Sequence, residues 1–577
     1  MGLKKNIKSA LIISKNKHMK NTRISFLIFS IIVMCFFNCE QQLEDIPEND
    51  LSADQLFADE EGTEQAVNGM YSQLQGYDYY GARMRLLLWP HSGKYQSKQN
   101  ANADANQLSI SNNNLNLDRL WRGMYQTVNQ VNTVILYVKD RDLDNKDTTL
   151  GQAYFIRALV YFDLVRMFGE VPLRTAPATV DDINIAKSSK EAIYNLVISD
   201  LKKALDLLPN RGEYLDGRPI KYAANAYLAK VYITLAGAND ATEQPENFNA
   251  VTESEITVAD ITNFWEEARG ELDEVINNGG YALTTTFGDL WEEGIGSRNT
   301  SESIFELQYG ATGASRDNDI IRDVVLAGHP IVAENTNTFG RIRPNKEMFN
   351  DHIIQYSGED YSGVDFISAG SGRDIINLDT NVADPRIDET YIFNSYTRTN
   401  NNRNVNLFPR VNRGNNAYAH LKKYKDLTYN GTNTFNNIIL MRYADILLMR
   451  AEVENEINGP SSAYAFVNQV LQRARTTESG TTQEPADWDA TSIPSKEVFR
   501  ERIMKEREYE LNGEGHEWFD MRRRGLGRFQ EQIDHHNAAV TFYSSENNRD
   551  FIFEDVENEM TLPIPSAELS GNNLINE

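Results

Sequence analysis

The sequence predicts a mainly α-helical protein, a tetratricopeptide-like superhelix of helix pairs, with a loop-rich, irregular portion that carries short strands. Apolar residues recur at three- and four-residue steps in several long segments, which places them on one face of a helix. This periodicity disappears between residues 296 and 436, where Asn, Gly, Asp and Thr are abundant. No Pro/Ser/Gly-rich linker separates long segments, so we expect residues 51–577 to form a single body.

Five segments predict helices, and residues 190–208 carry the clearest apolar stripe, which Pro209 follows as a normal stop. Segment 219–236 opens on Pro219 and is rich in Ala, so a neighbouring helix can approach it closely. Segment 262–279 ends at a Gly-Gly pair, which is typical of a helix C-terminus. Similar patterns predict helices over residues 151–168 and 438–457.

Paired amphipathic helices with small residues at their contacts are typical of tetratricopeptide-like repeats, although no clean 34-residue period is present. Within the loop-rich portion, residues 304–307 are one of a few short extended runs, so we expect loops and small strands there. Loops on a rigid scaffold commonly carry binding residues. The predicted division is an N-terminal helical part over 51–295, a loop-rich insertion over 296–436 and a C-terminal helical part over 437–577.

The segment 1–38 differs from the rest of the chain and predicts a secretory signal. It holds seven Lys or Arg and no Asp or Glu, and it ends in an apolar run from Ile24 to Phe37. That run is shorter than the ~20 residues that a membrane-spanning helix requires. A transmembrane anchor is the alternative, but no apolar residues extend the run past Cys39. Met19 begins a compact version of the same layout and is a second candidate start.

The two cysteines of the chain, Cys35 and Cys39, both lie at the end of this signal. Cleavage before Cys39 leaves one thiol on the first mature residue, which excludes an internal disulfide and suits the attachment of lipid. The preceding residues Phe36, Phe37 and Asn38 match the usual lipoprotein cleavage motif poorly, so a free thiol with cleavage elsewhere stays open. The acidic stretch 39–50 is interpreted as the lipidated tether.

The mature chain is strongly acidic. Without the signal it has 50 basic against 83 acidic residues, a net charge of −33 compared with −26 for the whole chain. Such a surface repels the phosphates of nucleic acid, so we expect no nucleic-acid partner. The sequence also contains no phosphate-binding GxxxxGK[ST] loop and no GxSxG nucleophile motif.

Charged residues inside the apolar helices are interpreted as structural, because a buried charge has to be paired. These residues are Arg157, Arg166, Arg442, Asp445 and Arg450. The mixed-charge stretch 514–524 is interpreted as a paired helix–turn corner rather than an anion site. His516, His535 and His536 lack the further ligands of a zinc site, so we expect no metal and no cofactor.

Sugar binding without catalysis requires flat aromatic faces beside amide, carboxylate or Arg groups that pair with hydroxyls. The stretch 76–114 offers this combination, and its predicted ligand contacts are Trp89 and Tyr95, followed by Tyr79 and Tyr80. The alternative for each ring is packing against the scaffold. A weaker predicted set lies in the loop-rich portion and consists of Phe339, Arg341 and Arg343.

Several stretches resemble the SusD/RagB family of nutrient-binding lipoproteins of Bacteroidetes. The strongest match runs from residues 151–158 to 168–173, and residues 441–452 are nearly as specific. Further matches occur at 51–57, 64–71, 506–511, 514–523, 562–565 and 568–569. These stretches occur in family order and cover nearly the whole mature chain.

The resemblance implies a body of four tetratricopeptide-like helix pairs with an irregular remainder. It also implies a lipid-anchored protein on the cell-surface side of the outer membrane, lying over a SusC-like TonB-dependent transporter. Such a protein captures oligosaccharides or polysaccharides for uptake and is not an enzyme. Two alternatives stay open: a secreted glycoside hydrolase, since two suitably spaced carboxylates suffice, and a helical-repeat scaffold that binds only protein.

Overall fold

The computed structural model describes residues 52–97, 103–213, 217–237, 263–292, 298–309, 318, 320–332, 338–360, 382–405, 418–429, 434, 436–543 and 560–576. The predicted signal, Cys39 and the tether lie outside these residues. The chain divides into two compact units, Met1–Gly62 and Thr63–Glu577. In the first unit, helix α2 (Ala53–Leu56) is closed by a capping box in which Ser52 and Gln55 bond to each other's backbone.

The second unit is mainly helical. Its helices are α3 (Glu60–Leu74, which begins in the first unit), α4 (Arg83–His91), α5 (Ala103–Asn106), α6 (Leu115–Val138), α7 (Lys146–Phe168), α8 (Lys190–Leu207), α9 (Lys221–Gly237), α10 (Phe264–Asn278), the 3-10 helix η2 (Gly288–Trp291), α11 (Ile320–Val324), α12 (Lys346–Ser357), α13 (Arg386–Thr390), α14 (Tyr443–Asn458), α15 (Pro460–Ala474), α16 (Lys496–Glu510), α17 (Glu517–Arg523), α18 (Leu526–Tyr543) and α20 (Ser566–Gly571).

The strands of the described residues are short and form antiparallel pairs. The pairs are β1 (Tyr95–Ser97) with β5 (Ile342–Pro344), β2 (Val171–Pro172) with β3 (Lys187–Ser188), β4 (Ser303–Leu307) with β10 (Ile438–Arg442), β6 (Tyr391–Ile392) with β9 (His420–Leu421), β7 (Tyr396–Thr397) with β8 (Asn404–Val405), and β11 (Thr476–Thr477) with β12 (Gly480–Thr481). The predicted fold class, mainly α with short strands in small sheets, is confirmed.

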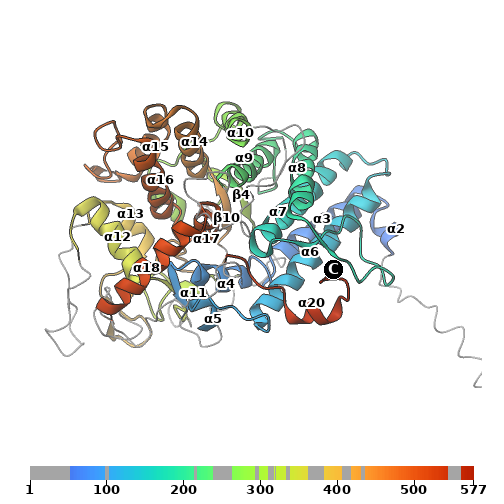
Figure 1. The fold of residues 1–577 in the computed structure, drawn as a ribbon, viewed down its shortest axis with the longest axis horizontal. Helices are drawn as coiled ribbons and strands as arrows, with labels where there is room; N and C mark the ends of the chain where they lie inside the picture. The colour runs from blue at the N-terminus through green and yellow to red at the C-terminus, as the bar shows by residue number, and fades with distance from the viewer. Residues whose placement is uncertain are drawn as a thin grey trace, which may run out of the picture. The chain divides into compact units, whose positions relative to one another are not determined.

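Successive helices of the second unit pack side by side in chain order. Helix α7 packs against α6 and α8, α9 against α8 and α10, and α14 against α10, α15 and α16. Figure 1 shows this row running from α6 through α9 and α10 to α14 and α15. The arrangement is that of tetratricopeptide-like helix pairs, and it arises because each helix buries its apolar stripe against the next one.

Helix α7 is buried on nearly all sides, so its charged residues need partners within the protein. The Arg157 guanidinium donates to both carboxylate oxygens of Asp200 on α8, at 2.7 and 2.9 Å. In the last turn of α7, Arg166 donates to Asp163 at 2.6 Å and lies over the ring of Phe519, 3.8 Å from its centroid. The structural interpretation of these two arginines is confirmed.

The other predicted buried charges are also paired. Arg442 forms ion pairs with Glu302, Glu510 and Glu514 at 2.7, 2.6 and 2.8 Å. Asp445 pairs with Arg507 and Lys230, and Arg450 pairs with Asp273 and Glu454. The 514–524 stretch belongs to the same system, since Asp520 pairs with Arg507 and Arg523. These pairs connect α9, α14, α16 and α17 and confirm the interpretation of a paired corner.

Three details of the structure correct the sequence-based boundaries. Residues 438–442 form strand β10 rather than the start of a helix, because they hydrogen-bond to β4 in an antiparallel ladder. Helix α9 begins at Lys221, so Pro219 precedes the helix instead of occupying its first turn. The loop-rich portion contains the twelve-residue helix α12, whose interrupted apolar pattern gave no clear stripe.

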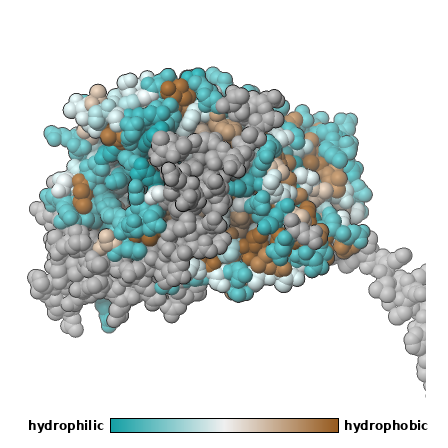
Figure 2. Space-filling model, in the orientation of Figure 1, coloured by the Kyte–Doolittle hydropathy of each residue, from teal (hydrophilic) through white to brown (hydrophobic). Residues whose placement is uncertain are grey.

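Among the described residues on the face shown in Figure 2, hydrophilic side chains predominate. This agrees with the excess of acidic over basic residues in the chain. None of the helices in the described ranges combines the length and the apolar character needed to cross a membrane.

Candidate functional site

The tyrosines of the first predicted set are bound to the helical scaffold. Tyr79 and Tyr80 stack on each other with ring centroids 4.5 Å apart, and both hydroxyls donate to Asp163 on α7, at 2.7 and 2.6 Å. Tyr79 is completely buried. Burial, reinforced by the neighbouring Asp163 carboxylate, raises the pKa of both phenols well above the usual value. Both hydroxyls therefore stay protonated near pH 7, and their hydrogen bonds attach the turn before α4 to α7.

Trp89 and Tyr95 lie at the two ends of the segment from α4 to β1 and pack on each other with ring centroids 5.1 Å apart. Trp89 is 6% exposed and Tyr95 is completely buried. The Tyr95 hydroxyl lies 2.9 Å from both Asn512 Oδ1 and Glu517 Oε1, and these two acceptors share its single proton. A sugar ring needs an open aromatic face, and in this structure Tyr79, Trp89 and Tyr95 present none. Tyr80 and Trp89 line a hollow of about 60 Å³, which has room for only a few water molecules.

The second predicted set behaves differently, because Phe339 is 46% exposed. The Arg341 guanidinium carbon lies 5.7 Å from the centre of the Phe339 ring, and Arg341 forms an ion pair with the buried Asp323. Arg343, by contrast, is buried and lies 3.8 Å from the centre of the Tyr418 ring. Phe339 thus offers an accessible aromatic ring, and the ion pair with Asp323 holds the Arg341 guanidinium beside it.

The fold brings the two predicted sets together although more than 240 residues separate them. Strands β1 and β5 pair so that Tyr95 lies opposite Pro344 and Gln96 opposite Arg343. Asp323 on α11 adds a second connection, because it pairs with Arg85 of α4 as well as with Arg341. The sequence-based reasoning missed Asp323, and no motif around it indicates this role.

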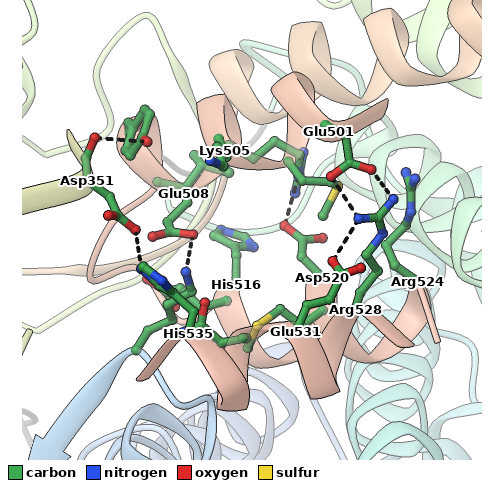
Figure 3. A pocket seen from close by; sticks show the side chains of 18 of the residues that line it. Asp351, Glu501, Lys505, Glu508, His516, Asp520, Arg524, Arg528, Glu531 and His535 are labelled. Carbon is green, nitrogen blue, oxygen red and sulfur yellow. Dashed lines mark hydrogen bonds and ion pairs between the residues drawn. The ribbon is translucent and has the colours of Figure 1, made fainter. Parts of the chain in front are cut away.

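A cavity of about 380 Å³ lies between α16, α17, α18 and α12 (Figure 3). Ion pairs cross its walls: Lys94 with Glu508 at 2.8 Å, His535 with Asp351 at 2.9 Å, and Arg528 with Glu531 at 2.8 Å. Figure 3 shows His516 in the middle of the view, between the Asp351–His535 side and the Arg528–Glu531 side.

Two neighbouring residues of this cavity have unusual protonation. Burial, followed by the nearby Lys230, lowers the pKa of His516 to about 3, so its imidazole is neutral near pH 7. Burial also raises the pKa of Glu517 to about 7, against the hydrogen bonds that its carboxylate receives. Sequence reasoning placed both residues in a helix–turn corner and weighed His516, with His535 and His536, only as a metal ligand. Within the described ranges, no group of three or more His, Cys, Asp or Glu residues is arranged to hold a metal ion.

A row of paired helices that carries loops and short strand pairs defines a helical-repeat protein. The SusD family model matches residues 301–577, and a family model described as "starch-binding associating with outer membrane" matches residues 43–233. SusD-like protein P2 of Formosa agariphila is 26% identical over 571 residues, covering 96% of this chain and 98% of that protein. The chain belongs to the SusD/RagB family.

Solved structures share the fold. The crystal structure of a SusD homologue from Bacteroides thetaiotaomicron has a TM-score of 0.67 at 18% identity, covering 89% of this chain and 96% of that one. A laminarin-binding SusD-like protein has a TM-score of 0.62 at 19% identity, with 90% and 98% of the two chains covered. These structures show the same fold, and the two family models confirm the resemblance indicated by the sequence motifs.

Proposed function

We propose that this protein is a cell-surface glycan-binding lipoprotein that passes oligosaccharides to a SusC-like TonB-dependent transporter in the outer membrane. Membership of the SusD/RagB family over both halves of the chain is the observation that carries this proposal. It is supported by the laminarin-binding relative of the same fold and by the signal that ends at Cys39. The protein has a binding role and no catalytic one.

The proposed contact surface centres on Phe339 and Arg341. An exposed aromatic ring offers a pyranose an apolar face, while the guanidinium beside it donates to sugar hydroxyls. Asp323 holds Arg341 and also Arg85, which lies one helical turn before Trp89 on α4. In this arrangement Trp89, Tyr95, Tyr79 and Tyr80 form the support beneath the surface, and they reach a ligand only at the edges of Tyr80 and Trp89.

Isothermal titration of the full chain against a panel of soluble polysaccharides tests the binding role. We expect one glycan to bind and Phe339→Ala to weaken it at least tenfold, because the stacking surface is lost. Leu115→Ala on α6 is the matched control, since Leu115 is also exposed and apolar but lies outside this surface. Binding to no glycan, together with no transporter co-purifying, refutes the proposal. Association with a transporter but with no glycan favours the protein-only scaffold.

The same panel separates the binding protein from a secreted glycoside hydrolase. Release of reducing sugar, measured after prolonged incubation, contradicts a non-catalytic role.

The anchor is tested by Cys39→Ser, with Cys35→Ser as the control within the same signal. We expect Cys39→Ser to abolish incorporation of radiolabelled palmitate and to release the protein from the outer-membrane fraction. Equal labelling of the two variants would place the lipid elsewhere.

A further inference from the structure

The cavity between α16, α17 and α18 has a hydrogen-bond donor on its floor that the protein leaves available. His516 is 8% exposed, and its Nδ1 lies 3.0 Å from Nζ of Lys230. An ammonium group can only donate, so Nδ1 accepts and the neutral ring carries its proton on Nε2. Among the described residues, none forms a hydrogen bond with this Nε2–H group.

The adjacent Glu517 supplies an acceptor. Its carboxylate is 7% exposed, and one oxygen, Oε1, receives both the Tyr95 hydroxyl and the Gly513 backbone N–H, each at 2.9 Å. The backbone N–H of Glu517 also hydrogen-bonds to this carboxylate, and no described cation pairs with Glu517. Both residues line the cavity, where a ligand or water molecules can complete their hydrogen bonds.

The rest of the cavity indicates the charge of that ligand. The side chains that surround the floor pair with one another, as Lys94 does with Glu508 and Asp520 with Arg507, and leave little net charge to attract an ion. Met504 and Met521 are half-buried in the wall and add an apolar, adaptable contact. The volume of about 380 Å³ falls within the range of small-ligand pockets, roughly 300–1,000 Å³.

We propose that this cavity is a second ligand site, which binds one uncharged sugar residue between the His516–Glu517 floor and the methionine wall. The Nε2–H of His516 donates to one hydroxyl of the sugar, and the Glu517 carboxylate accepts from a neighbouring hydroxyl. Met504 and Met521 cover the C–H face of the ring. The choice of a sugar rests on the proposed function, but the site is separate from the Phe339 surface.

The test is methyl NMR of the full chain with ¹³C-methyl-labelled methionine. The probes are glucose, galactose, mannose and xylose, with glucosamine and glucuronate as the cationic and anionic comparisons. We expect at least one neutral sugar to shift the Met504 and Met521 signals in a saturable manner. Met521→Trp fills the cavity and weakens that binding at least tenfold, and Met504→Phe is the second variant in case the first does not fold. Leu115→Ala leaves the titration unchanged.

Silence of both methionine signals with every neutral sugar overturns the proposal, and so does a response to glucosamine or glucuronate alone. Polysaccharide binding that depends on Phe339 is measured separately. If polysaccharide binding is present while the Met504 and Met521 signals do not shift, the glycan-binding function is supported and the second site is refuted. If the methionines respond while no polysaccharide binds, the second site stands and the Phe339 surface falls.

Discussion

Replacing Arg442 tests whether the buried ion pairs hold strands β4 and β10 against the C-terminal end of α16. This arginine is the last residue of β10, directly before α14, and is 1% exposed. Its guanidinium forms ion pairs with Glu302, Glu510 and Glu514 at 2.6–2.8 Å. Arg442→Met preserves most of the volume but removes the charge. Three buried carboxylates then share the remaining cations, Arg386, Arg473 and Lys423. Loss of one partner from a buried pair costs about 3–5 kcal/mol, so we expect a decrease of that size in unfolding free energy at pH 7.

The pH dependence of this deficit gives a second check. Burial alone would raise the pKa of Glu510, but Arg473, Arg442 and Arg386 overcome this effect and hold it at about 2. The stabilisation from Glu510 is therefore fully present above the pKa of the unfolded state, ~4.3, and is lost as the pH falls towards 2. Without Arg442 the carboxylates take up protons at higher pH. We expect the difference in unfolding free energy between the wild type and Arg442→Met to become smaller as the pH falls from 7 to 4.5.

Urea unfolding followed by tryptophan fluorescence measures both effects. Arg122→Met is the matched control, because Arg122 is 63% exposed and, among the described residues, forms an ion pair only with Asp118 on its own helix. Such surface pairs contribute about 0–1 kcal/mol. If Arg442→Met costs no more than Arg122→Met, or if its deficit does not depend on pH, the ion-pair network does not stabilise this fold in the manner argued.

Two further predictions concern a pair of helical glycines and the buried carboxylate of Glu517. A Cβ atom at Gly123 on α6 would lie 2.8 Å from the backbone oxygen of Asp78, so Gly123→Ala is expected to lower the unfolding free energy by about 1–3 kcal/mol. Gly270→Ala on α10, where nothing lies within 4 Å, should raise it by roughly 0.5–1 kcal/mol, and thermal melts that fail to separate these two variants contradict the packing argument. Because the pKa of Glu517 is raised to about 7 by burial, this residue contributes less stability as the pH rises from ~4.3 through 7. Glu517→Gln keeps an acceptor for Tyr95 and should gain stability over the wild type from pH 5 to pH 8; an advantage that does not grow over this range refutes the assignment.

Local patterns in the sequence predicted helices α7, α8, α9, α10 and α14 and the role of the buried arginines, but not α12 or strand β10. The apolar stripe over 190–208 predicts α8 (Lys190–Leu207) closely. Apolar residues on one face of a helix recur every three or four residues, so the pattern can be read from a short stretch of sequence. Arg157 and Arg442 could be interpreted without a partner in view, since a charge inside an apolar helix has to be neutralised somewhere. The family motifs are likewise contiguous, and they identified the SusD/RagB family before the fold was known.

The candidate sites depend on contacts between distant parts of the chain. The Trp89–Tyr95 and Phe339–Arg341 segments meet only through the β1–β5 pairing and Asp323, which no local pattern encodes. Whether an aromatic ring stacks on a ligand or packs in a core is decided by its solvent exposure. That exposure is a tertiary property, and it differs between the buried Tyr95 and the exposed Phe339.

The sequence by itself thus determined the helical architecture, the lipoprotein signal as an expectation, and the family, because each depends on residues close together in the chain. Only the tertiary structure decided that Tyr79, Trp89 and Tyr95 are buried while Phe339 is exposed. It also decided that His516 and Glu517 meet Met504 and Met521 around a cavity. The physical reason is the same in both cases: burial, pairing and cavity shape are set by which helices pack together, and that packing joins residues from separate segments.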